Sequence, residues 1–323
     1  MLPVLLAAAI ATASPAANVY AVPGKRVRVD GHRLNLVCLG AGRPVVVLDA
    51  GLGDWSPSWI PIQRRLASRT TVCAYDRAGY GFSEPASSPR TSDTIARELH
   101  RLLHAADLPA PYLLVGHSFG GLNVLAFTDL YRREVAGLVL VDGTAAGIAI
   151  PAALKPLMDA QLATMRTCAT SAHEGKLARS SPSFTACFNA LWGISSQPND
   201  GVTPLLVAAV EEQARTAAPY DAVISEMQNL TRSQHEVQAQ ERSLGDLPLA
   251  VLTASTHGEE AMPPALRASL QAFEPVWRRA HMRIAALSTR GHYELVRSGH
   301  YIQFDRPDVV IDAIEDVLAE IRG

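Results

Sequence analysis

Residues 116–121, Gly-His-Ser-Phe-Gly-Gly, constrain the fold of this chain more than any other segment. An apolar run at 112–115 precedes them, and a run of helical character over 122–131 follows. A Gly-x-Ser-x-Gly turn between a strand and a helix is the setting of a nucleophile elbow, which exposes the serine hydroxyl at the top of a sheet. We therefore expect Ser118 to have a strained backbone and to follow a strand directly.

Strand and helix patterns alternate along the chain on both sides of this turn. Short continuous apolar runs, typical of strands in a parallel sheet, occur at 44–48, 71–75, 137–141 and 248–252. A hairpin around Asp30-Gly31 is expected before them, and shorter strands are expected over 282–287 and 292–296. Helical patterns cover 91–106, 122–131, 264–279 and the segment after Pro307. Repeated strand–helix units predict an α/β fold with a mostly parallel, doubly wound sheet.

The alternation stops after residue 147 and resumes near residue 246. Residues 148–245 contain helix-like pieces and no convincing strand. The pattern predicts a helical lid, inserted between the strand that ends near Asp142 and the strand that starts near Pro248. The remaining core then consists of residues 22–147 and 246–323.

The first 21 residues differ in composition from the rest of the chain. They are apolar and alanine-rich, as in a secretory signal peptide, although no Lys or Arg stands near Met1. A secreted or periplasmic location is expected, and a cytoplasmic one is the alternative. The apolar runs are too short for a comfortable membrane span, so no integral membrane segment is predicted. The net charge of −2 and the scattered basic residues argue against a nucleic-acid partner.

Four cysteines are present, namely Cys38, Cys73, Cys168 and Cys187. No Cys-x-x-Cys motif or Cys/His cluster indicates a metal site. In an exported protein they could form two disulfides, and Cys168 with Cys187 is the expected pair in the lid because both lie in that insertion. Four buried thiols remain the alternative.

A serine nucleophile needs a base, and the base needs a third group to orient it. We expect the base to be His300, which follows the last predicted strand within Arg-Ser-Gly-His and precedes the final helix. The oxyanion hole needs two backbone amides. We assign them to Phe119, which follows the nucleophile, and to Leu52 in the glycine-rich loop after the strand at 44–48.

Five sequence motifs together resemble those of the α/β-hydrolase fold family, in its serine esterase and lipase-like group. They are Leu48-Asp-Ala-Gly-Leu-Gly53, Tyr75-Asp-Arg-Ala-Gly-Tyr-Gly-Phe-Ser83, Val115-Gly-His-Ser-Phe-Gly-Gly121, Leu138-Val-Leu-Val-Asp142 and Ser298-Gly-His-Tyr-Ile302. The resemblance covers about 25–147 and 246–322. It implies that Asp76 and Arg77 belong to a structural turn.

The third group, an acid that would orient His300, is less clearly indicated by the sequence than Ser118 and His300. The resemblance implies an aspartate in the loop after the strand near residue 250, but that loop carries none. Asp142, at the end of the strand after the nucleophile's, is our first choice because sequential parallel strands are often neighbours. Glu259 and Glu260 in the later loop are the alternatives.

These residues predict a serine hydrolase that cleaves a carboxylic ester or related acyl compound through an acyl-enzyme, without a cofactor or metal. The alternatives are an N-terminal peptidase, an acyltransferase, a cofactor-free haloperoxidase, or a non-catalytic protein that binds a small ligand. The substrate is expected to be a small, apolar acyl compound. Apolar residues of the lid are candidates for the pocket lining: Met158, Leu162, Met165, Phe184, Phe188, Trp192 and Met227.

Overall fold

The computed structural model describes residues 19–87, 89–148, 151–195, 202–240, 242–256 and 264–323. Its centre is one eight-stranded sheet with the order β1-β2-β4-β3-β5-β6-β7-β8. β1 pairs with β2 and β2 with β4 antiparallel, and the other neighbours are parallel, which confirms the mostly parallel α/β fold. The strands are β1 (Lys25–Val29), β2 (His32–Leu39), β3 (Val45–Asp49), β4 (Val72–Asp76), β5 (Tyr112–His117), β6 (Val135–Val141), β7 (Leu249–Ala254) and β8 (Gly291–Val296).

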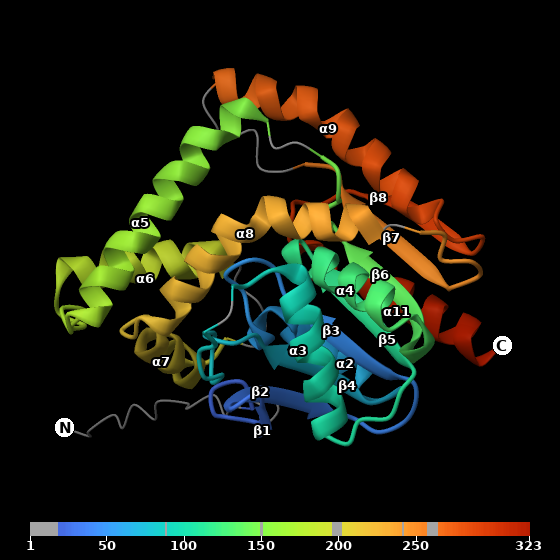
Figure 1. The fold of residues 1–323 in the computed structure, drawn as a ribbon, viewed down its shortest axis with the longest axis horizontal. Coiled ribbons are helices and arrows are strands. Elements are labelled where there is room, and N and C mark those ends of the chain that lie inside the picture. The colour runs from blue at the N-terminus through green and yellow to red at the C-terminus, as the bar shows by residue number, and fades with distance from the viewer. Residues whose placement is uncertain (1–18, 88, 149–150, 196–201, 241, 257–263) are drawn as a thin grey trace, which may run out of the picture.

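Helices cover both faces of this sheet (Figure 1). The apolar side chains of β3 alternate between two buried clusters, since successive residues of a strand point to opposite faces. Val45 and Val47 pack in the cluster that contains α3 (Ser92–Ala105), α4 (Phe119–Leu130) and the end of α9 (Pro264–Ala285). Val46 and Leu48 pack in the cluster that contains α2 (Ile60–Leu66) and α11 (Pro307–Arg322).

The strand expected over 282–287 is wrong. α9 continues to Ala285, six residues beyond the expected end of the helix at 279. Buried apolar residues at 280 and 284 extend its helical spacing, so the segment packs against the sheet as a helix and not as an added strand. β8 is therefore the last strand of the sheet, and it pairs with β7.

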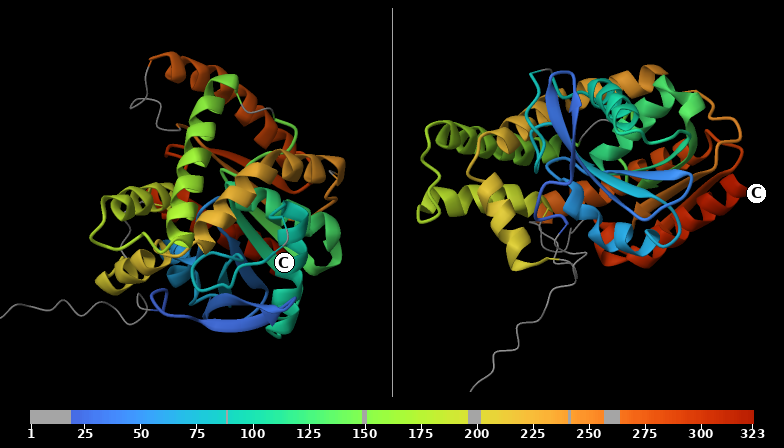
Figure 2. Two further views of the ribbon diagram at one scale, coloured as in Figure 1. Left: turned by 60° about the vertical axis from the view of Figure 1, so that its left-hand side comes forward. Right: turned by 90° about the horizontal axis from the view of Figure 1, so that it is seen from below.

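The described part of the insertion between β6 and β7 is helical. It contains the short 3-10 helix η3 (Ala152–Leu154), α5 (Lys155–His173), α6 (Pro182–Ser195), α7 (Pro204–Gln213) and α8 (Ala218–Gln240). α5, α6, α7 and the first part of α8 project beyond one side of the core. The C-terminal part of α8 lies over α3 and α4 (Figures 1 and 2). α8 thus connects the projecting helices to the helical layer of the core.

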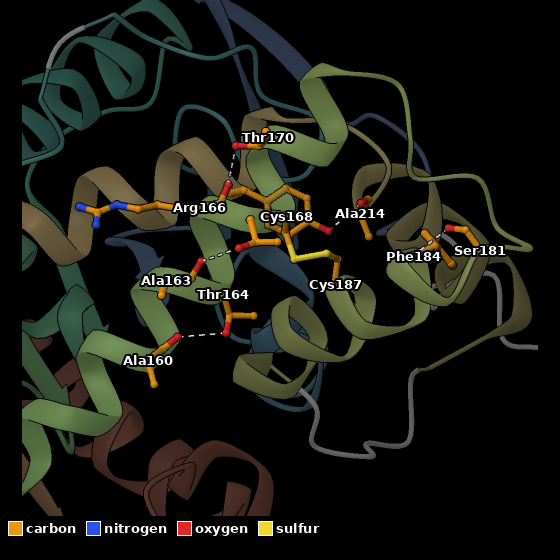
Figure 3. The surroundings of a disulfide bond; sticks show 12 residues. Ala160, Ala163, Thr164, Arg166, Cys168, Thr170, Ser181, Phe184, Cys187 and Ala214 are labelled. Atoms are coloured by element: carbon orange, nitrogen blue, oxygen red, sulfur yellow. Dashed lines mark hydrogen bonds between the residues drawn. A yellow bond between two sulfur atoms is a disulfide. The ribbon is translucent and has the colours of Figure 1, made fainter.

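Two disulfides tie neighbouring elements together. Cys168 on α5 is bonded to Cys187 on α6, the pair expected in the insertion, and Phe184 is buried in the same apolar cluster (Figure 3). Cys38 and Cys73 stand opposite each other in the register of β2 and β4, and they form the second disulfide.

The folded core begins before residue 22. The Tyr20 side chain is 1% exposed, and its hydroxyl donates to Gln63 Oε1 at 2.7 Å. Ala21 is also buried. The sequence-based boundary after residue 21 would therefore separate two packed residues from the domain. In the described part of the chain, no helix has the length and apolar character that a membrane crossing requires.

Candidate active site

Ser118 stands at the junction of β5 and α4. Its φ of 51° and ψ of −119° lie in a region that a residue with a Cβ rarely adopts, as expected for a nucleophile elbow. Glycines let the flanking backbones approach. A Cβ on Gly116 would lie 2.5 Å from the carbonyl oxygen of Gly120, and one on Gly120 would lie 2.3 Å from that of Asp49. The sharp turn therefore depends on the two glycines of the Gly-x-Ser-x-Gly pattern.

Three side chains from distant parts of the sequence form a hydrogen-bonded chain. The distance from Ser118 Oγ to His300 Nε2 is 3.0 Å, and the distance from His300 Nδ1 to Asp142 Oδ2 is 2.6 Å. His300 lies in the loop between β8 and the short helix α10 (Ile302–Asp305), and its side chain is 32% exposed. A carboxylate accepts and cannot donate, so Nδ1 carries the proton and Nε2 is left to accept from the Ser118 hydroxyl.

Asp142 is fully buried in the turn directly after β6. Its Oδ1 accepts from the Ala254 amide at 3.1 Å and from Trp277 Nε1 at 2.9 Å, while Oδ2 faces His300. The two oxygens of the carboxylate therefore have separate partners, which fixes the plane of the group. Glu259 and Glu260, the alternative acids, lie outside the described residues.

α9 holds the turn at Asp142 through a second side chain. His281, one helical turn after Trp277, places Nε2 at 2.6 Å from the Gly143 carbonyl oxygen and Nδ1 at 2.6 Å from Thr253 Oγ1. Because a carbonyl only accepts, Nε2 carries the proton and Nδ1 accepts from the threonine hydroxyl. Sequence reasoning missed both residues, and their i, i+4 spacing on α9 is the signal that points to one shared contact surface.

His117, the other histidine near the nucleophile, is fully buried. Its Nε2 donates to the carbonyl oxygen of His300 at 3.1 Å. Burial, and then the charge that His300 can carry, lower the pKa of His117 to about 3. The ring is thus neutral across the physiological range and braces the loop that holds His300.

The loop after β3, which contains Leu52, packs against the elbow. A Cβ on Gly51 would lie 3.0 Å from His117 Nδ1, and Gly120 on α4 approaches the carbonyl oxygens of Asp49 and Ala50. The loop that carries Leu52 is therefore held next to the first turn of α4, where the Phe119 amide lies.

Arg77 holds the loop after β3 through the hydrogen bonds of its guanidinium group. The guanidinium is 1% exposed and donates to Asp49 Oδ1 at 2.9 Å, to the Ala50 and Gly51 carbonyl oxygens at 2.7 Å each, and to both oxygens of Glu226 at 2.7 and 3.1 Å. All five N–H donors of the side chain are used. Since Glu226 belongs to α8, Arg77 joins the loop to the insertion across 149 residues of sequence.

A cavity of about 420 Å³ opens beside Ser118 and His300. Its apolar wall comes from the insertion and from α9, and includes Leu154, Met158, Leu230, Leu270, Phe273 and Trp277. Thr144, Gln234 and Glu274 supply polar atoms, and Arg278 pairs with the Glu274 carboxylate. The charge of Glu274 is thereby balanced, so the cavity favours a neutral, largely apolar group.

The expected pocket lining is correct only in part. Met158 lines the cavity, as expected. Met165 and Phe184 are instead buried in the apolar cluster around the α5–α6 disulfide, and Phe188 and Met227 pack against that cluster. Leu162 is partly exposed and lies outside the cavity lining, and the side chain of Trp192 is not among the described ones. Most of these apolar residues of the insertion pack its helices together and do not line the cavity. The opposite wall of the cavity comes from α9.

Comparisons with known proteins agree with the fold. A family model described as alpha/beta hydrolase fold matches residues 44–186. The uncharacterized protein YqjL of Bacillus subtilis is 26% identical over 279 residues, which cover 86% of this chain and 85% of that protein.

Two solved structures show the same fold at low sequence identity. A thermophilic esterase from Thermogutta terrifontis superposes with a TM-score of 0.63 at 19% identity, covering 94% of this chain and 99% of that one. The enol-lactonase from Burkholderia xenovorans superposes with a TM-score of 0.61 at 18% identity, covering 91% and 100%.

Proposed function

The chain belongs to the α/β-hydrolase fold family, and on that premise we propose that it is a serine hydrolase that cleaves a carboxylic ester. The observation that carries the proposal is the chain of hydrogen bonds from Ser118 through His300 to the buried carboxylate of Asp142. This order of nucleophile, base and acid is the one that activates a serine hydroxyl.

In the proposed reaction, Ser118 Oγ bonds to the ester carbonyl carbon while its proton moves to His300 Nε2. The carbonyl oxygen becomes an oxyanion, which the amides of Leu52 and Phe119 stabilise. The tetrahedral intermediate then expels the alcohol, which takes the proton from Nε2. Water, deprotonated by His300, attacks the acyl-enzyme, and collapse of the second intermediate releases the acid and restores the Ser118 hydroxyl.

The proposed substrate is an ester with a neutral, apolar acyl group that fits the cavity between α8 and α9. The balanced charge of Glu274 disfavours a substrate with a free ammonium group, as an N-terminal peptidase would require. A non-catalytic ligand-binding protein is the second candidate. It would use the same cavity, but it would have no need of an aligned base beside Ser118.

A fluorophosphonate probe separates the two candidates, since it labels an activated serine. We expect the purified protein to be labelled at Ser118 and to hydrolyse p-nitrophenyl esters of short to medium chain length. Ser118→Ala and His300→Ala should each lower ester turnover by at least ~10³-fold without unfolding the protein. An unlabelled, folded protein would favour the ligand-binding role.

We also propose that the protein is exported. Disulfides form and persist mainly in oxidising compartments, and the chain contains two of them. The packing of Tyr20 against Gln63 supports a leader that is cut before that residue. Protein isolated from its native compartment should start at or upstream of Tyr20, and after denaturation without reductant its cysteines should resist alkylation.

A further inference from the structure

Two histidines and a glutamate converge at the end of α4 that lies far from Ser118. His100 and His104 stand one turn apart on α3, and Glu134 lies in the short 3-10 helix η2 (Arg132–Glu134) that follows α4. His100 Nε2 is 3.0 Å from Glu134 Oε1, and His104 Nε2 is 2.9 Å from Glu134 Oε2. The candidate ligand atoms of the three side chains all lie within 4.8 Å of one another.

The surrounding side chains hold this cluster in place. The His100 ring stacks on Tyr131 with a centroid distance of 3.7 Å and an interplanar angle of 6°. Tyr131 in turn packs on Phe127 of α4, and its carbonyl oxygen accepts from the Glu134 amide at 2.8 Å. His100 and Glu134 are therefore fixed by packing and backbone contacts, while His104, 54% exposed, leaves the cluster open to solvent.

The geometry points to a surface binding site for a divalent transition metal, in which His100, His104 and Glu134 are the ligands. Imidazole nitrogen with a carboxylate oxygen suits Zn²⁺, Cu²⁺ and Ni²⁺. Metal–ligand distances of about 2.0–2.2 Å place neighbouring ligand atoms roughly 3.0–3.4 Å apart, close to the two nitrogen–oxygen distances here. Two histidines and one acid leave at least one position for solvent.

The simpler explanation is that Glu134 pairs with two histidine rings without any metal. Other His–carboxylate pairs on this protein show what that looks like. His173 meets Asp221 at 3.0 Å with side chains 62% and 50% exposed, and there one carboxylate faces one ring. The cluster on α3 differs because two ring nitrogens converge on one carboxylate, which brings three ligand atoms of the kind that a divalent transition metal binds to one place.

The metal site and the nucleophile lie at opposite ends of the same helix. Ser118 precedes the first residue of α4, whereas Glu134 follows its last residue. At 1.5 Å per residue, α4 separates them by roughly 18 Å. A metal at this position would join α3 to the segment that enters β6, so we expect it to stabilise the fold and to leave ester turnover unchanged.

The test uses tag-free, full-length protein and Zn²⁺ alone. Calorimetric titration of the wild type should give a saturable site with one Zn²⁺ per chain, and thermal unfolding in saturating Zn²⁺ should occur at a higher temperature, by ~3–6 °C. His104→Gln should weaken binding at this site by at least ~10-fold and reduce the thermal shift at the same Zn²⁺ concentration. Glu134→Gln should do the same.

His173→Gln is the matched control, because it removes an exposed histidine that faces a single carboxylate. It should bind Zn²⁺ like the wild type. Because His104 is exposed, His104→Gln should keep the fold, which circular dichroism can verify. Equal Zn²⁺ affinity in His104→Gln and the wild type would overturn the proposal, as would the lack of any one-to-one binding in the wild type.

Discussion

At the scale of single residues, the identity of the acid decides how His300 is oriented. Asp142→Asn keeps the shape of the side chain and removes its charge, so ester turnover should fall by ~10³–10⁴-fold with little change in folding. Steady-state kinetics together with a thermal unfolding curve measure both effects. The double change Glu259→Gln with Glu260→Gln is the comparison and should cost less than ~10-fold. The opposite pattern of losses would assign the acid to the later loop.

Trp277 should act as a positioning residue for the acid. Trp277→Phe keeps the aromatic wall but removes the hydrogen bond to Asp142 Oδ1. The carboxylate then has one donor fewer to fix its plane, so it holds the His300 ring less firmly. We expect kcat to fall by ~10-fold, about one hydrogen bond to a charged group, while KM for short esters stays near the wild-type value.

Phe273→Leu is the control for the wall itself, because Phe273 lines the same cavity one turn earlier on α9. It should alter KM for long acyl groups and leave kcat near the wild-type value. If both variants change KM alone and neither lowers kcat, Trp277 is a packing residue.

At the scale of elements, the contact between α8 and the loop after β3 rests on a buried charge network. Glu226→Gln removes the negative charge that faces Arg77 and leaves a buried guanidinium partly unpaired. We expect the free energy of unfolding to fall by about 3 kcal/mol, as for other buried pairs that lose one partner. Urea denaturation monitored by circular dichroism measures the change.

Glu212→Gln provides the matched substitution, since Glu212 pairs with Arg215 on the surface with side chains 59% and 41% exposed. Its cost should stay below ~0.5 kcal/mol, because exposed pairs contribute little. Of the two variants, only Glu226→Gln should also lower ester turnover. The reason is that Arg77 donates hydrogen bonds to the carbonyl oxygens of the two residues before Leu52. Equal stability losses in the two variants would contradict the role of the network.

The elements that the sequence predicts well are those with a local pattern. The Gly-x-Ser-x-Gly turn, the apolar strands and the position of His300 after the last strand are readable because each depends on residues that are close in sequence. The wall of the cavity cannot be predicted from such a local pattern, because α9 contacts the Asp142 turn across 135 residues of sequence. The contact between Arg77 and Glu226, which spans 149 residues, cannot be predicted for the same reason. Likewise, His100 and His104 have a helical spacing, but Glu134 joins them only through the fold.

At the scale of the whole molecule, stability should depend on pH through His117. Its pKa is about 3 in the folded protein, mainly because of burial, and about 6.5 when the chain is unfolded. Between these values the unfolded chain binds the proton and the folded one does not, so the free energy of unfolding decreases as the pH falls below about 6.5. From pH 7 to pH 5 this group should cost about 2 kcal/mol.

Urea denaturation of the wild type and of His117→Gln over pH 5–8 isolates this contribution. The comparison is needed because His32 acts in the opposite direction: its hydrogen bond to Glu98 raises its pKa, so that its contribution is lost as the pH rises. The acid-induced loss should be smaller in His117→Gln. His292→Gln, with a ring 72% exposed, is the control and should keep the wild-type slope. Parallel curves for the wild type and His117→Gln would refute the prediction.

The double use of Trp277 has a consequence for how the substrate range of this protein can change. The ring borders the cavity, while its N–H donates to the Asp142 carboxylate. A substitution there that admits a new acyl group would disturb the acid in the same step, whereas Leu270 and Phe273 border the cavity without that second duty in the described contacts. Directed evolution toward larger esters should therefore collect its first beneficial changes at positions 270 and 273, and leave position 277 as tryptophan.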